Sequence, residues 1–146
     1  MIKIYTDGSY KPSTNQGGYA SIIINDDKIV KILQQGYINT TNNRMEIMGV
    51  LKALEFFKTP QDIIIYSDSS YVVSSMSNNY VRRWVSDNDT SKKNMDLWSK
   101  ILNLSNFHNV KFVWVKGHND NRWNELADIY ANISATVENP QIDLED

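Results

Sequence analysis

The segment that decides the fold of this chain opens with Thr40-Thr41-Asn42-Asn43-Arg44-Met45-Glu46. The pattern from Asn42 to Lys58 predicts a helix, which ends before Pro60 because the residue before a proline disfavours helical backbone. Asn42 or the threonines before it can cap this helix, since a short side-chain oxygen accepts the unpaired N–H groups of the first turn.

One acid in this helix needs an explanation. Glu46 falls on the same apolar stripe as Val50, Ala53 and Phe57, at spacings of four, three and four residues. A carboxylate there is unfavourable unless it is paired or holds a cation. Two interpretations stay open at this point. Glu46 is either an edge residue that reaches water or pairs with a base of its own helix, or one member of a larger acidic site.

The composition is that of one folded domain. At 146 residues the chain is long enough for a sizeable core, and its hydrophobic fraction of 41% is too high for a disordered protein. It contains no cysteine, which excludes disulfides and thiolate metal sites and fits a reducing compartment. No signal peptide and no membrane-spanning run is visible, so we expect a cytoplasmic monomer with no membrane partner.

Charge is unevenly distributed along the chain. The net charge of −2 argues against a polyanionic partner, but residues 137–146 hold four acids and no base. Without them the body has 15 basic and 13 acidic residues, and it can still bind phosphate if its acids gather around metal ions. We therefore predict a folded domain over residues 1–136 and an acidic, flexible tail over residues 137–146.

The rest of the pattern predicts an α/β fold. We expect a mixed five-stranded sheet flanked by helices, with the first three strands antiparallel, the later strands parallel and the first strand central. Residues 78–94 are polar and basic, with weak structure signals. The expected strands are Ile2–Thr6, Tyr19–Ile24, Lys28–Tyr37, Asp62–Ser67 and Val110–Val115, and the later helices span residues 68–76, 94–104 and 121–135.

Further acids lie at the ends of expected elements. Asp7 follows the first strand and Asp68 follows the fourth, so parallel pairing of these strands would bring both carboxylates to the point where strand order reverses. Taken singly, each is also a common turn or helix-cap residue. Asp128 lies on the last helix, on a face of small residues with Ala131 and Ala135; its alternative is a surface acid.

Four acids gathered in one place would require a counter-charge. Their carboxylates would repel one another and raise one another's pKa values. Oxygen ligands without cysteine select Mg²⁺ or Mn²⁺ over zinc. Two such ions about 4 Å apart would fit phosphodiester cleavage by in-line attack of an activated water.

Short blocks of sequence occur at the expected element boundaries. They are Tyr5-Thr6-Asp7-Gly8-Ser9, Gly17-Gly18-Tyr19, Thr41-Asn42-Asn43-Arg44-Met45-Glu46, Ser67-Asp68-Ser69, Lys93-Asn94-Met95-Asp96-Leu97-Trp98, Trp114-Val115-Lys116-Gly117-His118, and Asn124 with Ala127-Asp128. In this order the blocks resemble the type 1 ribonucleases H, from Tyr5 to about Ala131.

The resemblance implies a reaction and its cofactors. It implies endonucleolytic cleavage of the RNA strand in an RNA–DNA hybrid, which leaves a 3′-hydroxyl and a 5′-phosphate. It also implies two Mg²⁺ ions, with Mn²⁺ as a substitute, one to activate the water and the other to stabilise the leaving 3′-oxygen. The implied ligands are Asp7, Glu46, Asp68 and Asp128.

The two histidines differ in their match to the family. His118 corresponds to a loop histidine that assists turnover, and an imidazole that titrates near neutrality suits that role. An ordinary loop histidine is the alternative. His108 matches no motif, and we expect it at the surface.

Polar residues near the first helix resemble the family's contacts to the hybrid, a duplex recognised by its shape and its 2′-hydroxyls. Asn42 and Asn43 resemble minor-groove contacts, and a helix cap is a compatible second role. Thr41 and Asn94 resemble a pocket for one DNA phosphate.

Two positions depart from the family's pattern. Ser70 stands where Gln is common, so one groove contact is in doubt. Asn15 can substitute for an Asn that is frequent at position 13, where this chain has Ser.

A basic, aromatic segment occupies the place of the family's basic protrusion, and its composition suits contact with backbone and sugar. It is short and diluted by Asp87 and Asp89, so we expect weaker and more salt-sensitive hybrid binding than in strongly basic relatives. The alternative is a solvated loop with a tryptophan packed beneath it. The residues concerned are Tyr80, Arg82, Arg83, Trp84, Lys92 and Lys93.

Other functions compete with this interpretation. The block at residues 41–46 argues against an integrase or junction resolvase, and the four acids argue against a module that binds hybrids without cutting them. A small phosphate-binding domain would be expected to have a glycine-rich loop, which this sequence lacks. A nuclease module of a reverse transcriptase stays open, although a chain that starts at Met1 favours a free-standing enzyme.

Overall fold

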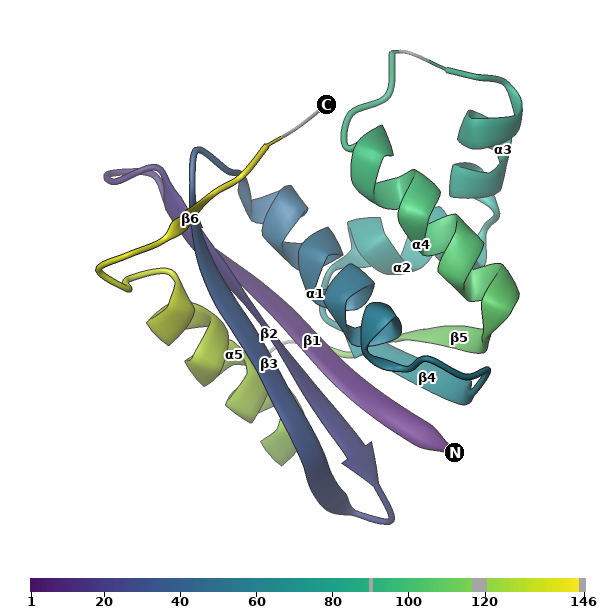
Figure 1. Ribbon diagram of the computed structural model, residues 1–146, viewed down its shortest axis with the longest axis horizontal. Coiled ribbons are helices and arrows are strands. Elements are labelled where there is room, and N and C mark those ends of the chain that lie inside the picture. Colours follow the sequence, from purple (N-terminus) through teal and green to yellow (C-terminus); the bar gives the residue numbers. More distant parts are fainter. Residues whose placement is uncertain (90, 117–120, 145–146) are drawn as a thin grey trace.

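A six-stranded mixed sheet with helices on both faces forms the molecule (Figure 1). The computed structural model describes residues 1–89, 91–116 and 121–144. The elements are β1 Ile2–Lys11, β2 Gln16–Asn25, β3 Lys28–Ile38, α1 Asn42–Phe56, β4 Asp62–Ser67, α2 Ser70–Ser77, α3 Tyr80–Ser86, α4 Met95–Phe107, β5 Asn109–Trp114, α5 Arg122–Ser134 and β6 Gln141–Ile142.

The predicted sheet is confirmed in its class and its centre. The strand order is β5-β4-β1-β2-β3-β6, with β1 antiparallel to β2 and parallel to β4. The sequence predicted five strands, and the sixth, β6, is a two-residue strand parallel to β3. Two residues are too few to show a hydrophobic alternation, which is why the sequence pattern did not indicate β6.

β1 continues past the point where the sequence predicted a turn. Asp7-Gly8-Ser9 lies inside the strand because its pairing with β2 runs on to Lys11. The parallel ladder with β4 is shorter, and its last pair is Thr6 with Ser67. Asp7 and Asp68 are therefore the next residues along two neighbouring strands.

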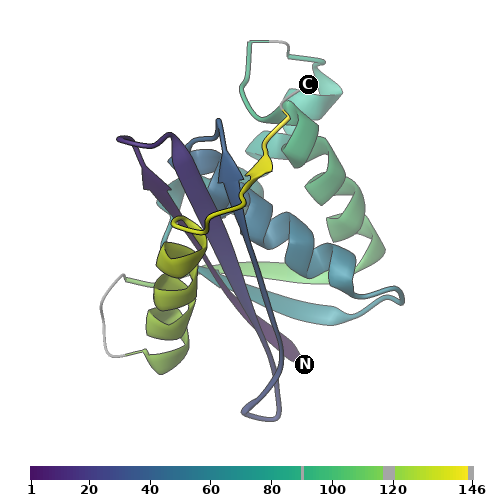
Figure 2. The same ribbon diagram turned by 60° about the vertical axis from the view of Figure 1, so that its left-hand side comes forward.

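The helices divide between the two faces of the sheet. Figures 1 and 2 show α1 to α4 on one face and α5 on the other. Thr41 caps α1, since its hydroxyl accepts from the N–H of Arg44 at 3.1 Å, as the sequence allowed. The larger core lies between α1, α4 and the sheet around the fully buried Trp98, and a smaller one packs Tyr5 and Ala127 under α5.

A buried ion cluster ties the first turn of α1 to the C-terminal segment. Arg44 is 2% exposed and pairs with Asp96 of α4 at 2.8 Å and with Asp143 at 2.7 Å. Burial lowers the pKa of Arg44, but the hydrogen bonds and charges of the two acids outweigh it and raise the pKa overall. Thr40 also donates to Asp143, at 2.8 Å.

The tail predicted to be flexible takes part in this packing. Gln141–Ile142 pairs with β3, and the side chain of Asp143 is 3% exposed. The expectation rested on the surplus of acids in the tail, but one of those acids is a buried partner of Arg44. The division of the chain at residue 136 stays a prediction.

Asp143→Ala should lower the free energy of unfolding by about 3 kcal/mol, because it leaves Arg44 buried with one of its two counter-charges removed. Urea titration measures the change. Glu138→Ala in the exposed part of the same tail is the matched control and should shift it by less than about 0.5 kcal/mol. Equal small effects would show that the ion cluster contributes little to stability.

Candidate active site

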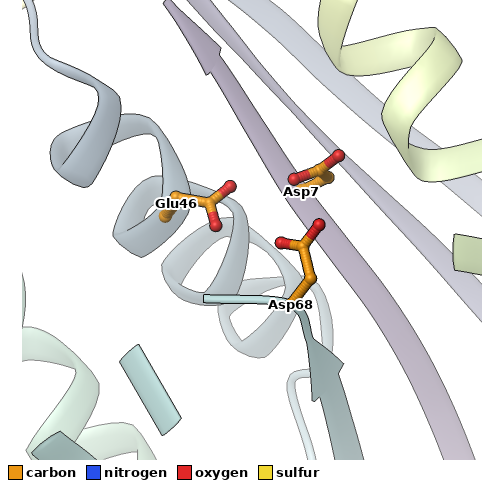
Figure 3. Close-up of side chains that lie close together, drawn as sticks. All are labelled: Asp7, Glu46 and Asp68. Carbon is orange, nitrogen blue, oxygen red and sulfur yellow. The ribbon is translucent and has the colours of Figure 1, made fainter. Parts of the chain in front are cut away.

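Three carboxylates from three different elements converge at the edge of the β1–β4 ladder (Figure 3). Asp7 lies in β1, Glu46 lies in the first turns of α1, and Asp68 is the residue that follows β4. Each offers one oxygen, and these oxygens lie within 4.8 Å of one another. The ladder's end at Thr6 and Ser67 explains the approach of the two aspartates.

Glu46 reaches the aspartates because the strand beneath it has no side chain at Gly8. A Cβ at Gly8 would lie 2.5 Å from the Glu46 nitrogen, which is too close for any side chain. The N–H of Gly8 donates to Oε1 of Glu46 and, at 2.9 Å, to Oδ1 of Asp7. Gly8 therefore permits the contact between β1 and α1 and also orients two of the acids.

Asp128 lines the same open pocket from the opposite face of the sheet. We call this pocket of about 460 Å³ the acidic pocket. The carboxylate of Asp128 lies outside the tight group of three, but it faces Asp7 and helps to raise the pKa of Asp7. The pocket is lined by Asp7, Gly8, Asn42, Asn43, Glu46, Asp68, Ser69, Ser70, Tyr71 and Asp128.

The acids of the pocket are charged at a cost in free energy. Burial raises the pKa of Asp7 most, and the charges of Glu46 and Asp68 raise it further. Burial likewise raises the pKa of Glu46 and of Asp68. Hydrogen bonds with Asp7 lower both pKa values in part, while the charge of Asp68 raises that of Glu46 and the charge of Asp128 raises that of Asp68. A divalent cation would relieve this repulsion, and an all-carboxylate donor set is what a hard cation such as Mg²⁺ prefers. The residues present therefore fit a divalent metal.

Known proteins resemble this chain over most of its length. The RNase H family model matches residues 1–136. Over 146 residues the chain is 39% identical to Ribonuclease HI of Synechocystis sp., covering 97% of this chain and 91% of that protein.

The chain belongs to the ribonuclease H family. Its resemblance to the type 1 members is thereby confirmed. It is also 41% identical over 136 residues to Ribonuclease H of Chlorobium phaeobacteroides, covering 89% of this chain and 92% of that one. Among solved structures, LC11-RNase H1 in complex with an RNA/DNA hybrid has a TM-score of 0.75 at 20% identity, covering 92% of this chain and 96% of that one. That likeness shows the fold alone.

Within this ribonuclease H fold, three predicted substrate residues lie in the acidic pocket. Asn42 and Asn43, exposed at the start of α1, and Ser70, exposed at the start of α2, line it together with the acids. Ser69 and Tyr71 line it too and were not predicted. Their position within three residues of Asp68 in the sequence was the available signal. The contacts of all these residues with a hybrid stay predictions.

Thr41 and Asn94 come together around Arg44 rather than in the acidic pocket. Thr41 accepts from the main-chain N–H of Arg44, and the Asn94 oxygen accepts from its guanidinium at 3.3 Å. The sequence predicted that these two residues act as a pair, and the structure places both beside one arginine. Their role as a phosphate pocket is not tested by these contacts.

The remaining predicted contacts lie outside the acidic pocket. Asn15, in the β1–β2 turn, accepts from the Tyr10 hydroxyl at 2.7 Å and donates to Asn39. In the basic segment, where weak structure was expected, residues 80–86 form α3. Two cation–π pairs lie in this segment, Arg83 over Tyr80 at 5.4 Å and Lys92 over Trp84 at 5.2 Å. Arg82 contacts Asn106, and Lys93 is exposed.

The two histidines have different outcomes. His118 lies outside the described residues, so its role stays a prediction. His108 was expected at the surface, and that prediction is wrong: it is 4% exposed. Its Nδ1 accepts from the N–H of Gln61 at 3.1 Å, which makes Nε2 the donor to the carbonyl of Leu54 at 3.2 Å. Main-chain groups thus satisfy the hydrogen bonds of both ring nitrogens. Because these partners are distant in the sequence, no motif around His108 indicates them.

Asp7→Asn should stabilise the metal-free protein at high pH. Raised pKa values mean that the folded protein binds more protons than the unfolded chain above pH values near the ordinary 3.8, so its free energy of unfolding falls as pH rises through this window. The variant has one carboxylate fewer, so its free energy of unfolding should exceed that of the parent by about 1 kcal/mol or more at pH 8 and by less at pH 5.

Urea titrations in chelator at both pH values measure this difference. Glu138→Gln, an exposed acid outside the pocket, is the control and should follow the parent at both values. A parent protein more stable than Asp7→Asn at pH 8 would contradict the predicted repulsion.

Proposed function

We propose that the chain is an endonuclease that hydrolyses the RNA strand of RNA–DNA hybrids by two-metal-ion catalysis and leaves 3′-hydroxyl and 5′-phosphate ends. The observation that carries the proposal is the convergence of Asp7, Glu46 and Asp68, with Asp128 in the same pocket, in a member of the ribonuclease H family. The curated relatives named Ribonuclease HI and Ribonuclease H support it.

The proposed cofactor is Mg²⁺, two ions per site, with Mn²⁺ as a substitute. The four acids Asp7, Glu46, Asp68 and Asp128 would hold the ions. When bound, two divalent ions supply an activated water and stabilise the leaving oxygen. The protein contributes a rigid, largely buried set of carboxylates, because Asp7 and Glu46 are 5% exposed and both accept from Gly8.

The rim of the acidic pocket is the proposed surface for the hybrid. Asn42, Asn43 and Ser70 present amides and a hydroxyl beside the acids, and such groups both donate and accept at 2′-hydroxyls and base edges. Asn15 and the pair Thr41 and Asn94 are proposed to contact the strands farther along. The complex of LC11-RNase H1 with an RNA/DNA hybrid supports this use of the fold.

The proposed setting is the cytoplasm, with the chain acting as a monomer and His118 assisting turnover. The chain contains no cysteine, as a reducing compartment permits. Among the described residues, no helix combines the length and the apolar character needed to cross a membrane.

Asp68→Asn should abolish cleavage of a labelled RNA–DNA hybrid. The loss should exceed the roughly 100-fold that removal of an outer partner of a metal site costs, because the variant removes a proposed ligand itself. Parent protein should cut only the RNA of the hybrid, only with Mg²⁺ and not in chelator. Double-stranded DNA, double-stranded RNA and single-stranded RNA should remain intact in parallel reactions.

Asp62→Asn is the matched control, since Asp62 starts the same strand, β4, and is exposed. It should cleave like the parent. Cleavage of DNA by the parent protein would show that the proposed substrate is wrong. Binding of the hybrid by the parent without cleavage would show that the protein is a binding module. Gel electrophoresis of the products against 3′-hydroxyl and 3′-phosphate markers tests the proposed ends.

Lys92→Ala combined with Lys93→Ala should weaken hybrid binding and flatten its dependence on salt. For each phosphate that a lysine no longer neutralises, the slope of log affinity against log salt should fall in magnitude by about 0.9. Anisotropy with the Asp68→Asn protein measures binding without cleavage. Lys28→Ala, an exposed lysine in the β2–β3 hairpin, is the control. An unchanged slope, or a parent slope near zero, would show that the basic segment does not contact phosphates.

A further inference from the structure

A side-chain amide of α5 is held by two residues of β1. The Asn132 carbonyl oxygen accepts from the Ser9 hydroxyl at 2.8 Å and from the Lys11 ammonium at 3.2 Å. Alternate residues of a strand face the same side of the sheet, so Asp7, Ser9 and Lys11 form one row facing α5. Asn132, which is hydrogen-bonded to two residues of this row, thus lies beside the acidic pocket.

The other end of the same amide is bonded to the fourth acid. The Asn132 amino group donates to the Asp128 carbonyl at 3.0 Å and to Oδ1 of its carboxylate at 3.3 Å. Four residues separate Asp128 and Asn132, one turn of helix, so both project from the same face of α5. The orientation of the amide is determined, because a flipped amide would present its amino group to the Ser9 and Lys11 donors.

The carboxylates of Asp7 and Glu46 each accept from a donor that orients them, and Asp68 is held at its main chain. Gly8 donates to Asp7 and to Glu46, and the Trp114 indole donates to the main-chain carbonyl of Asp68 at 3.2 Å. Asp128 lies outside the tight group of three carboxylates and approaches from the opposite face of the sheet. Its position relative to Asp7 therefore depends on how α5 is held against β1.

We propose that Asn132 is a positioning residue, which fixes the carboxylate of Asp128 toward the acidic pocket by bridging it to Ser9 and Lys11 of β1. Asn132 acts through Asp128 and makes no contact with a cation itself. The inference rests on the proposed function, since it requires Asp128 to hold a divalent ion. Groups in this outer position around a metal site orient the ligands, and their loss typically weakens metal affinity.

Asn132→Ala should weaken the affinity of the intact protein for Mn²⁺ about tenfold, measured by calorimetry with the metal alone. In cleavage of the hybrid, kcat should fall while KM stays within about twofold, because ground-state binding of the duplex is untouched. A higher Mn²⁺ concentration should restore kcat. In an Asp128→Asn background the same alanine substitution should leave the Mn²⁺ affinity unchanged, because the residue through which Asn132 acts is already altered.

A second variant separates positioning from simple docking of the helix. Ser134→Ala removes another bond between α5 and the sheet, the 3.2 Å contact with Gln34, away from the acidic pocket. It should lower the melting temperature without changing Mn²⁺ affinity. Should the alanine variant at 132 fail to fold, Asn132→Leu fills a similar volume without a donor and should show the same weakened affinity.

Three results would overturn the proposal. The first is an unchanged Mn²⁺ affinity in Asn132→Ala. The second is a loss of Mn²⁺ affinity in Ser134→Ala as large as that in Asn132→Ala. The third is an equally large loss when Asn132→Ala is added to the Asp128→Asn background. A parent protein that binds no Mn²⁺ and cuts no hybrid overturns the proposed function together with this inference. A parent that binds and cuts, with an unaffected variant, overturns the inference alone.

Discussion

The parallel pairing of β1 with β4, and the place where it stops, is the constraint on which the rest of the structure depends. After Thr6 and Ser67 the two strands part, and the next residue of each is an aspartate. β1 stays in the sheet through its pairing with β2, which keeps Asp7 rigid instead of leaving it in a turn. With no side chain at Gly8, α1 can approach closely enough for Glu46 to join them. The site is thus a result of backbone register and one missing Cβ.

Two buried charges in the first turns of α1 have opposite environments. Arg44 is enclosed by Asp96 and Asp143, so its charge is balanced within the protein. Glu46, two residues later, is surrounded by further carboxylates, so its charge is not. The first arrangement stabilises the fold without any ligand, whereas the second favours a bound cation. Buried charges that protein groups leave unbalanced are the ones to examine for function.

Most of the fold, and the meeting of the four acids in one pocket, were predictable from the sequence because they follow local patterns. The helix from Asn42, the strand Asp62–Ser67 and the order of elements all have clear periodicity or caps, and the four acids lie at boundaries that such patterns locate. The exceptions are residues whose burial depends on distant partners. The buried His108 is hydrogen-bonded to main-chain groups of Leu54 and Gln61, and the buried Asp143 is paired with Arg44. No pattern within a few residues carries that information.

The contact between Arg44 and Asp143 also bears on when the fold is completed. The two residues are 99 positions apart in the sequence. During synthesis α1 emerges from the ribosome long before the acid that balances its arginine. Closing so long a loop is slow, as is any topology dominated by distant contacts. The buried charge of Arg44, in the helix that carries Glu46, therefore gains its second counter-charge only after the segment around Asp143 has been synthesised.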